Sequence, residues 1–211
     1  MDPIQLKQRV QELEAEVQQL RQEAERLRLM NQRWAQLAGT DSLTGLPNKI
    51  SFMRALAPQD IQHARTQGEA IGFMLLSGDN LGPINETKGR DAGDQVLRGL
   101  AEFLRSALKG EERLGHLDGS HYAVVLYPAD LAQVRNRAEG LRLEVAAHAF
   151  ACADTEVRIT ASFGITSVDS NIISEPRSAA EKVYQLLNGA LYRAKKTGGN
   201  RIEEAVVDVA L

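Results

Sequence analysis

The chain has 211 residues, 43% of them hydrophobic, and a formal net charge of -3. This length allows one ordinary domain with an appendage, and the charge gives no general electrostatic reason to expect binding to nucleic acid or to a membrane. No apolar run approaches the length of a membrane span, the first residues lack the apolar segment of a signal peptide, and a single cysteine excludes an internal disulfide. We therefore expect a cytoplasmic protein in which Cys152 is a small buried or half-buried side chain.

The first predicted element is a long helix over residues 4 to 38, which contain no glycine and no proline. Its apolar positions recur at alternating steps of four and three residues, the heptad repeat of a coiled coil. These positions are Leu6, Val10, Leu13, Val17, Leu20, Ala24, Leu27, Asn31 and Trp34. Leucine at d, valine at a and one polar asparagine at a are typical of parallel dimers, so we expect a homodimer through this helix.

Charged residues flank the apolar stripe and are complementary between two parallel helices. In a parallel dimer a g residue faces the e residue five places on in the partner. The resulting pairs are Arg9 with Glu14, Glu16 with Arg21, and Glu23 with Arg28. Each exposed pair contributes only a few tenths of a kcal/mol, so these pairs select the partner and its orientation. The alternative, a single solvated helix lying on its own domain, is disfavoured by this complementarity.

Gly39 ends the heptad repeat, and Thr40 or Asp41 could cap whatever follows. Beyond this point helical and strand-like patterns alternate. Strands are predicted at 71–76, 113–117, 121–126, 157–168 and 202–209, and helices at 92–108, 131–147 and 179–196. The hairpin around Gly119 favours an α/β domain of the α+β type, with a mixed, mainly antiparallel five-stranded sheet flanked by helices. We therefore expect a coiled-coil helix (1–39) and one domain (40–211).

Four stretches of this domain carry recognisable motifs: DSLTGLPN from Asp41, NETKGRDAGD from Asn85, ASFGIT from Ala161 and ALYRAKKTGGN from Ala190. In order and spacing they resemble the DxLTGLxN, NDxxGHxxGD, SxGIA-like and ALYxAKxxGRN motifs of GGDEF domains, the diguanylate cyclases. The matches extend over roughly 160 residues. The resemblance implies a nucleotidyl-cyclase-like fold, and it suits the first helix because GGDEF domains commonly follow a dimerising helix.

The resemblance also implies a reaction. In this family two GTP molecules meet across a dimer, each with two divalent ions, and a ribose 3′-hydroxyl attacks the partner's α-phosphate. The ions neutralise the phosphates and generate the nucleophile, and they require carboxylate ligands. Here the signature loop aligns with Asp118, Gly119, Ser120, His121 and Tyr122. The acidic ligand and the second acid are therefore replaced, and Asp118 adds a negative charge where phosphates should approach.

The second ligand position is altered as well. Ser77 stands at the first aspartate of the family's DxD, while Asp79 survives at the second and is a weak metal candidate. The phosphate-contacting lysine is Gly82 and the arginine of GRN is Gly199, although Lys195 is retained. A hydroxyl is a poor Mg²⁺ ligand beside a carboxylate. We therefore expect no synthesis of cyclic-di-GMP and no cofactor, with Mg²⁺ needed only if the chain is a divergent active cyclase.

The residues at the family's guanine-binding positions are better retained than those at its metal-binding positions. Asn85 and Asp94 match the family's guanine-binding residues, with Leu81 at the aromatic position of the apolar wall. Asp94 could instead cap a helix, and Asn85 could sit in a turn. The family's inhibitory RxxD site appears as Lys109-Gly-Glu-Glu112, in which lysine cannot form the bidentate fork of arginine. We expect that pair to be solvated at the surface.

The histidines of the hairpin, His116 and His121, do not have the spacing of a metal site. Ser120 and His121 should point to opposite faces of a strand, which excludes a nucleophile and its base. Three functions remain open. The first is an inactive signalling or scaffolding dimer with a guanine nucleotide ligand and an unidentified protein partner. The others are a divergent diguanylate cyclase and a purely structural coiled-coil dimer.

Overall fold

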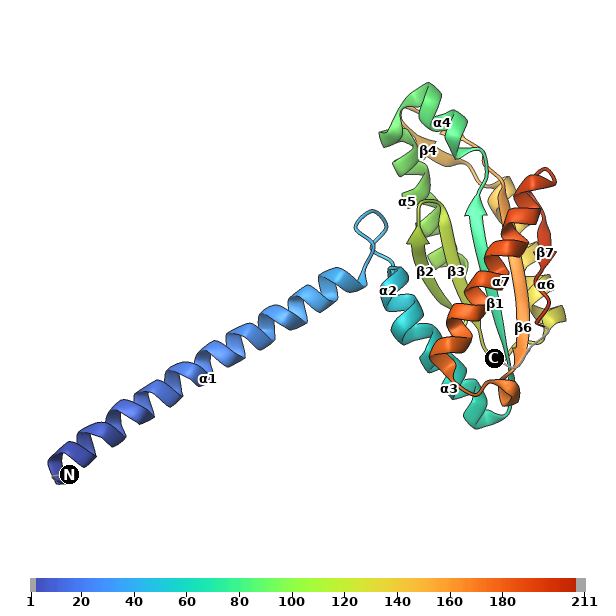
Figure 1. The fold of residues 1–211 in the computed structure, drawn as a ribbon. Helices are drawn as coiled ribbons and strands as arrows, with labels where there is room; N and C mark the ends of the chain where they lie inside the picture. The colour runs from blue at the N-terminus through green and yellow to red at the C-terminus, as the bar shows by residue number, and fades with distance from the viewer. Residues whose placement is uncertain (1–2, 208–211) are drawn as a thin grey trace. The chain divides into compact units, whose positions relative to one another are not determined.

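The computed structural model describes residues 3–207, apart from the side chains of some residues in the first helix (Figure 1). The chain forms two units, Met1–Gly39 and Thr40–Leu211, which are described separately. None of the helices in the described residues is both long and apolar enough to cross a membrane.

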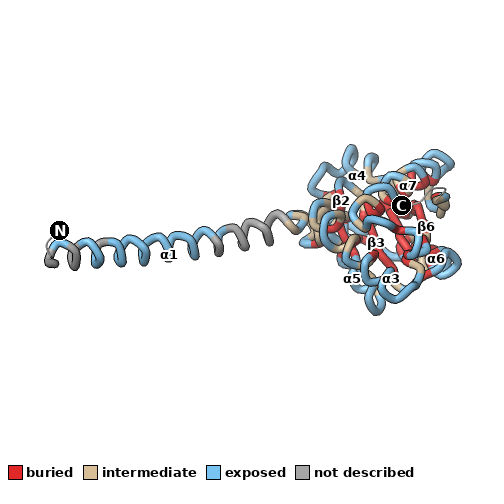
Figure 2. The backbone as a smooth tube through the Cα atoms, turned by 60° about the horizontal axis from the view of Figure 1, so that its bottom comes forward, coloured by how far each residue is buried: buried red, intermediate tan, exposed pale blue. Residues whose placement is uncertain are grey.

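The first unit is one helix, α1 (Pro3–Gly39), where the sequence predicts a helix over 4 to 38. Apolar side chains at heptad core positions are 44 to 64% exposed along it; they are Val10, Leu13, Val17, Leu20 and Leu27. Figure 2 shows the described part of α1 as exposed. The side chains at the other predicted positions Leu6, Asn31 and Trp34 lie outside the described residues. The visible stripe is apolar surface that a single helix leaves in water.

The second unit is built on a five-stranded sheet in the order β2-β3-β1-β6-β7. The strands are β1 (Ala70–Gly78), β2 (Arg113–Asp118), β3 (His121–Leu126), β6 (Ala161–Asp169) and β7 (Ile202–Glu204). All neighbouring pairs are antiparallel except β6 and β7. The prediction of a mixed, mainly antiparallel five-stranded sheet is confirmed. The central strand β1 is buried on both faces, which explains its unbroken apolar run.

Helices cover both faces of the sheet (Figure 1). The core on one face joins Met74 and Leu76 of β1 to α5 (Arg90–Ala107) and α6 (Leu131–Ala147). The core on the other face joins alternate β1 residues to α3 (Ala57–Gln67) and α7 (Pro176–Lys196). Because successive side chains of β1 point to opposite faces of the sheet, they pack into two separate cores.

The remaining elements are short. Before α3 lie α2 (Lys49–Ser51) and a π-helical turn (Phe52–Leu56). After β1 comes α4 (Leu81–Lys88), and a 3-10 turn (Ser170–Ile172) follows β6. The strands β4 (Phe150–Cys152) and β5 (Thr155–Val157) form a separate hairpin, in which Cys152 is buried as expected.

The structure corrects several predicted boundaries. The strand predicted at 157–168 is two strands in different sheets, because the chain leaves the β4–β5 hairpin at Val157 and enters β6 at Ala161. The helical stretch from 49 to 67 is not predicted by the sequence analysis. The last strand ends at Glu204, and positions 208 and 209 lie outside the described residues. Asp41 caps no helix; its carboxylate accepts from the amides of a turn at residues 43 and 44.

Candidate functional site

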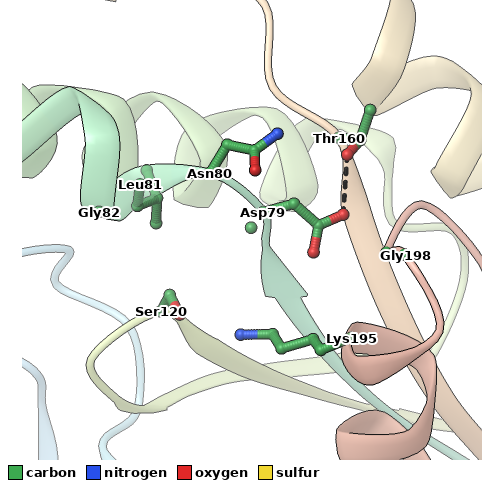
Figure 3. Close-up of a pocket in the computed structure, with 10 residues that line it drawn as sticks. Asp79, Asn80, Leu81, Gly82, Ser120, Thr160, Lys195 and Gly198 are labelled. Carbon is green, nitrogen blue, oxygen red and sulfur yellow. Dashed lines mark hydrogen bonds between the residues drawn. The ribbon is translucent and has the colours of Figure 1, made fainter.

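A pocket of about 390 Å³ lies beyond the end of β1 (Figure 3). It is lined by Gly78, Asp79, Asn80, Leu81, Gly82, Ser120, Thr160, Lys195, Gly198 and Gly199. These residues come from the β1–α4 segment, the β2–β3 turn, the residue before β6, the end of α7 and the loop that follows α7. The substituted positions 82, 120 and 199 therefore meet at one place.

The two hydroxyls at the substituted ligand positions touch one another. Ser77 is fully buried at the end of β1, and its Oγ lies 2.6 Å from the Oγ of Ser120 in the β2–β3 turn. Lys195 Nζ donates to the same Ser77 oxygen at 2.6 Å. In Figure 3 the lysine extends from α7 towards the side of the pocket where Ser120 lies. Two hydroxyls and one ammonium group, joined by hydrogen bonds, thus occupy the place where carboxylates would be needed to hold a metal ion.

The surroundings of Lys195 disfavour its charged ammonium form. Burial lowers the pKa of Lys195 below its ordinary value, and the charge of Asp79 offsets this only in part. Within the described part of the chain, Lys195 has no carboxylate at ion-pair distance. A divalent ion at this point would meet a like charge and two hydroxyls.

Asp79 faces the pocket, but both of its carboxylate oxygens already accept hydrogen bonds. Oδ2 accepts from Thr160 Oγ1 at 2.7 Å and from the amide of Asn200 at 2.9 Å. Oδ1 accepts from Ser162 Oγ at 2.8 Å. Among the described residues there is no group of three or more His, Cys, Asp or Glu side chains that could hold a metal ion. The residues present therefore do not fit the two divalent ions that the family's reaction uses.

Comparison with known proteins decides the family. The family description "Diguanylate cyclase, GGDEF domain" matches residues 38–201. The chain belongs to the GGDEF family. It is 34% identical over 170 residues to the diguanylate cyclase DgcP of Pseudomonas aeruginosa, covering 81% of this chain and 24% of DgcP. It is also 35% identical over 98 residues to the cyclic di-GMP phosphodiesterase NbdA of the same organism, covering 46% of this chain and 12% of NbdA.

A solved structure is similar over most of the chain. It is the coiled coil and GGDEF domain of DgcB from Caulobacter crescentus in complex with c-di-GMP, with a TM-score of 0.73 and 27% identity. The match covers 92% of this chain and 99% of that one. In contrast, the chain spans about a quarter of the length of DgcP. The family assignment from the four motifs is therefore confirmed.

In the signature turn of this GGDEF domain, the surroundings of Asp118 differ from the expectation. The carboxylate of Asp118 accepts from His121 Nδ1 at 2.7 Å and from Lys49 Nζ at 3.2 Å, and Asp118 does not line the pocket. Burial alone would raise the pKa of Asp118, but these two hydrogen bonds lower it overall. The negative charge therefore has two partners in the fold, and the repulsion of phosphates stays a prediction. Lys49 lies 69 residues away in the chain, and no spacing signal points to it.

The other residues of the turn make separate contacts. Ser120 binds Ser77 while His121 binds Asp118, so they do not act together. Ser120 lies in the turn and not on a strand. The two side chains are therefore kept apart by their different hydrogen-bond partners, and not by the alternation of side chains along a strand. Tyr122 is buried, and its hydroxyl donates to the carbonyl of Leu97 on α5 at 2.8 Å.

The two guanine-binding candidates lie close together on adjacent helices. Asn85 is on α4, and Asp94 is inside α5, which begins at Arg90 without a side-chain cap. Neither the cap nor the turn considered for them is observed. Within the described residues neither side chain has a hydrogen bond or an ion pair, and neither lines the 390 Å³ pocket. The Asn85 amide covers Gly93, where an added Cβ would overlap its Oδ1.

This contact gives a testable prediction. Gly93→Ala should force the Asn85 side chain to move while the fold stays intact, because the overlapping atom is at the end of a flexible side chain. Alanine is favoured over glycine in a helix by about 1 kcal/mol, so the melting temperature should hardly fall. Gly140→Ala, with nothing within 4 Å of the new Cβ, is the matched control on α6. Thermal melting of both variants checks this; a loss of folding in Gly93→Ala alone would contradict it.

The lysine and acid at the position of the inhibitory site do not form the solvated surface pair that the sequence predicts. Glu112 accepts both Nε and an Nη of Arg137 at 2.7 and 2.8 Å, and both side chains are mostly buried. The backbone amide of Lys109 donates to the same carboxylate at 2.8 Å. Arg137 also donates to the carbonyl of Ala107 at 2.6 Å. Glu112 is therefore paired with Arg137 of α6.

Proposed function

We propose that this chain is a catalytically inactive GGDEF module that dimerises through α1 and signals or scaffolds through protein contacts. It keeps a weak, metal-independent site for guanine nucleotides. The observation that carries the loss of catalysis is the contact between Ser77 and Ser120 with Lys195 attached to it. A catalyst of this reaction needs carboxylate-bound metal at that place, and a missing metal removes several kcal/mol of transition-state stabilisation.

The names of the relatives do not decide the activity. The chain is similar both to a protein named a diguanylate cyclase and to one named a cyclic di-GMP phosphodiesterase, and it spans only a small share of each. Whether the chain is catalytically active therefore has to be argued from the residues of its site. Asp79 accepts hydrogen bonds from Thr160, Ser162 and Asn200, which leaves it little further capacity to accept, and a single carboxylate does not supply the ligands for two divalent ions.

Nucleotide binding is supported by the side chains of Asn85 and Asp94, which have no hydrogen-bond partners within the described part of the chain. A carboxylate accepts from N1–H and the exocyclic amine, which only guanine presents together. Phosphate contacts should be weak because Gly82 and Gly199 offer no cationic side chain, and Lys195 is the nearest one. GMP should therefore bind about as well as GTP, and Mg²⁺ should matter little.

Calorimetric titration tests this proposal. We expect weak binding of GTP and GMP, no binding of ATP, and the same result with and without Mg²⁺. Asp94→Asn should abolish the preference for guanine because an amide can accept only one of the two hydrogens. Asp91→Asn, an exposed acid one turn earlier on α5, is the matched control and should bind normally.

Failure of the nucleotide site would be visible in the same samples. If saturating GTP, GMP and cyclic-di-GMP all leave the melting temperature and the amide spectrum of residues 81 to 94 unchanged, no nucleotide binds. The domain would then be a fold kept for its protein contacts alone.

A further inference from the structure

His116 connects two turns that are far apart in the sequence. It lies on β2 with 3% of its surface exposed. Its Nδ1 is 2.8 Å from Oδ1 of Asp41, in the turn that directly follows α1 in the chain. Its Nε2 is 2.9 Å from the carbonyl oxygen of Gly119, next to Ser120 in the β2–β3 turn. One ring thus holds the entry turn (residues 41–46) and the turn that places Ser120 against Ser77.

Both partners of this ring are hydrogen-bond acceptors. A neutral imidazole has one N–H, and a carbonyl oxygen cannot donate, so the contact with Gly119 places that hydrogen on Nε2. The contact with Asp41 then requires one further proton, either on Nδ1 or on the carboxyl group. The Thr44 hydroxyl lies 2.8 Å from Asp41 Oδ1 and 3.3 Å from His116 Nδ1, and its single hydrogen, donated to either atom, leaves the contact between those two atoms without one. Without the extra proton, the Nδ1 lone pair would face a carboxylate at 2.8 Å.

We propose that a single proton shared by Asp41 and His116 acts as a clasp between the entry turn and the Gly119–Ser120 turn. When this proton is removed at raised pH the ring keeps one N–H. That N–H faces the Asp41 carboxylate, because a hydrogen bond to a charged acceptor is stronger than one to a carbonyl, and the contact of Nε2 with Gly119 breaks. The Gly119–Ser120 turn is then released, and with it the contact of Ser120 with Ser77 at the pocket. The inference concerns the regulation of the site in the proposed function, but the clasp itself does not depend on nucleotide binding.

The charges around the ring favour this arrangement. Burial alone would raise the pKa of Asp41, but hydrogen bonds from His116 and Thr44 lower it overall, so in this contact the carboxylate is the ionised acceptor. Tyr122 of β3 stacks on the ring at 4.5 Å between centroids, and burial raises its pKa, so it stays neutral.

Other charged groups near the ring are engaged with different partners. Arg105 of α5 donates to the carbonyl of Thr44 at 3.4 Å. Beyond the turn, Asp118 is paired with His121 and Lys49. In the described residues Asp41 is the carboxylate that pairs with His116.

The pH window follows from these groups. A lowered pKa means that the contribution of ionised Asp41 is present above its ordinary range and is lost as the pH falls through the folded value. The clasp therefore opens at the acid end when Asp41 is protonated, and at the other end when the shared proton is removed.

Nitrogen-15 NMR of the full chain with labelled histidine tests the clasp. While the clasp is closed both ring nitrogens of His116 should carry hydrogen, and raising the pH should remove one of these two hydrogens. Amide hydrogen exchange at Gly119 and Ser120, corrected for its intrinsic pH dependence, should then accelerate roughly tenfold or more, the size expected for one lost charge-assisted hydrogen bond. A neutral single tautomer at every pH, or no accelerated exchange, would overturn the proposal.

Three variants isolate the role of His116. His116→Arg carries a permanent cation with several donors and should keep the turn closed at every pH. His116→Gln should leave the turn open at every pH, because a neutral amide cannot replace the ion pair. His121→Gln, which changes the neighbouring histidine, should keep the wild-type pH dependence. If His121→Gln removes that dependence, the transition belongs to His121 and the clasp does not exist.

The readouts separate this inference from the proposed function. Ring titration and amide exchange need no ligand, so a clasp that titrates in a chain without nucleotide affinity would remove only the nucleotide site. Circular dichroism at each pH confirms that the variants are folded. Should a variant not fold, the wild-type titration alone still decides the result.

Discussion

The chain should convert no detectable GTP to cyclic-di-GMP in the presence of Mg²⁺ or Mn²⁺. Positions 77 and 120 carry hydroxyls in mutual contact, and Lys195 donates to the buried one. Without carboxylates to hold the ions, several kcal/mol of transition-state stabilisation are absent, which lowers the rate by roughly a thousandfold or more. Chromatography with mass detection of the product measures this. Robust turnover by the unmodified chain would show that the metal site lies elsewhere.

Restoring the signature turn alone should not restore activity. The variant Asp118→Gly, Ser120→Asp, His121→Glu returns one ligand, but Ser77 and Gly82 still lack the second carboxylate and the phosphate-contacting cation. The change also removes both acidic and imidazole partners of the Lys49–Asp118–His121 group. Melting curves of this variant provide the control for folding. Activity in this variant would mean that one carboxylate, with Asp79, is sufficient.

The second large effect concerns α1. Replacing Leu13 and Leu20 with glutamate should convert a parallel dimer to monomers. Each leucine is at a d position and 44 or 64% exposed in the single chain, so it has apolar surface to bury against a partner. Burying a leucine contributes about 1.5–3 kcal/mol, and a buried unpaired carboxylate costs more, so dimer affinity should fall more than a hundredfold. Sedimentation over a range of concentrations measures the change.

The matched control adds the same two charges on the outer face of the helix. Ala15 and Gln22 occupy the outer f positions of the same two heptads and are exposed. Their replacement by glutamate adds the same charges and should leave the dimer intact. If the wild type is already monomeric at high micromolar concentration, the heptad interpretation is wrong, and the exposed stripe requires another partner.

The sequence by itself determined the elements whose signals are local or repeat at a fixed spacing. The heptad steps predict α1, and the apolar runs predict β1, β3 and α6 because side-chain periodicity follows directly from backbone geometry. The four GGDEF motifs, each a short continuous segment, identify the family and the substituted positions 77, 82, 120 and 199. In the structure positions 82, 120 and 199 line one pocket, and Ser77 contacts Ser120 beside it.

Only the tertiary structure decided which polar groups meet. Asp118 finds Lys49, Glu112 finds Arg137 and His116 finds Asp41 across 69, 25 and 75 residues of chain. No periodicity connects such pairs, because their distance is set by sheet register and helix packing and not by spacing along the chain. The β4–β5 hairpin was not predicted because its strands have three residues each, which is too short for a periodicity to appear. Charges that the sequence shows as unpaired are therefore compensated in the fold, and this changes the expected electrostatics of the signature turn.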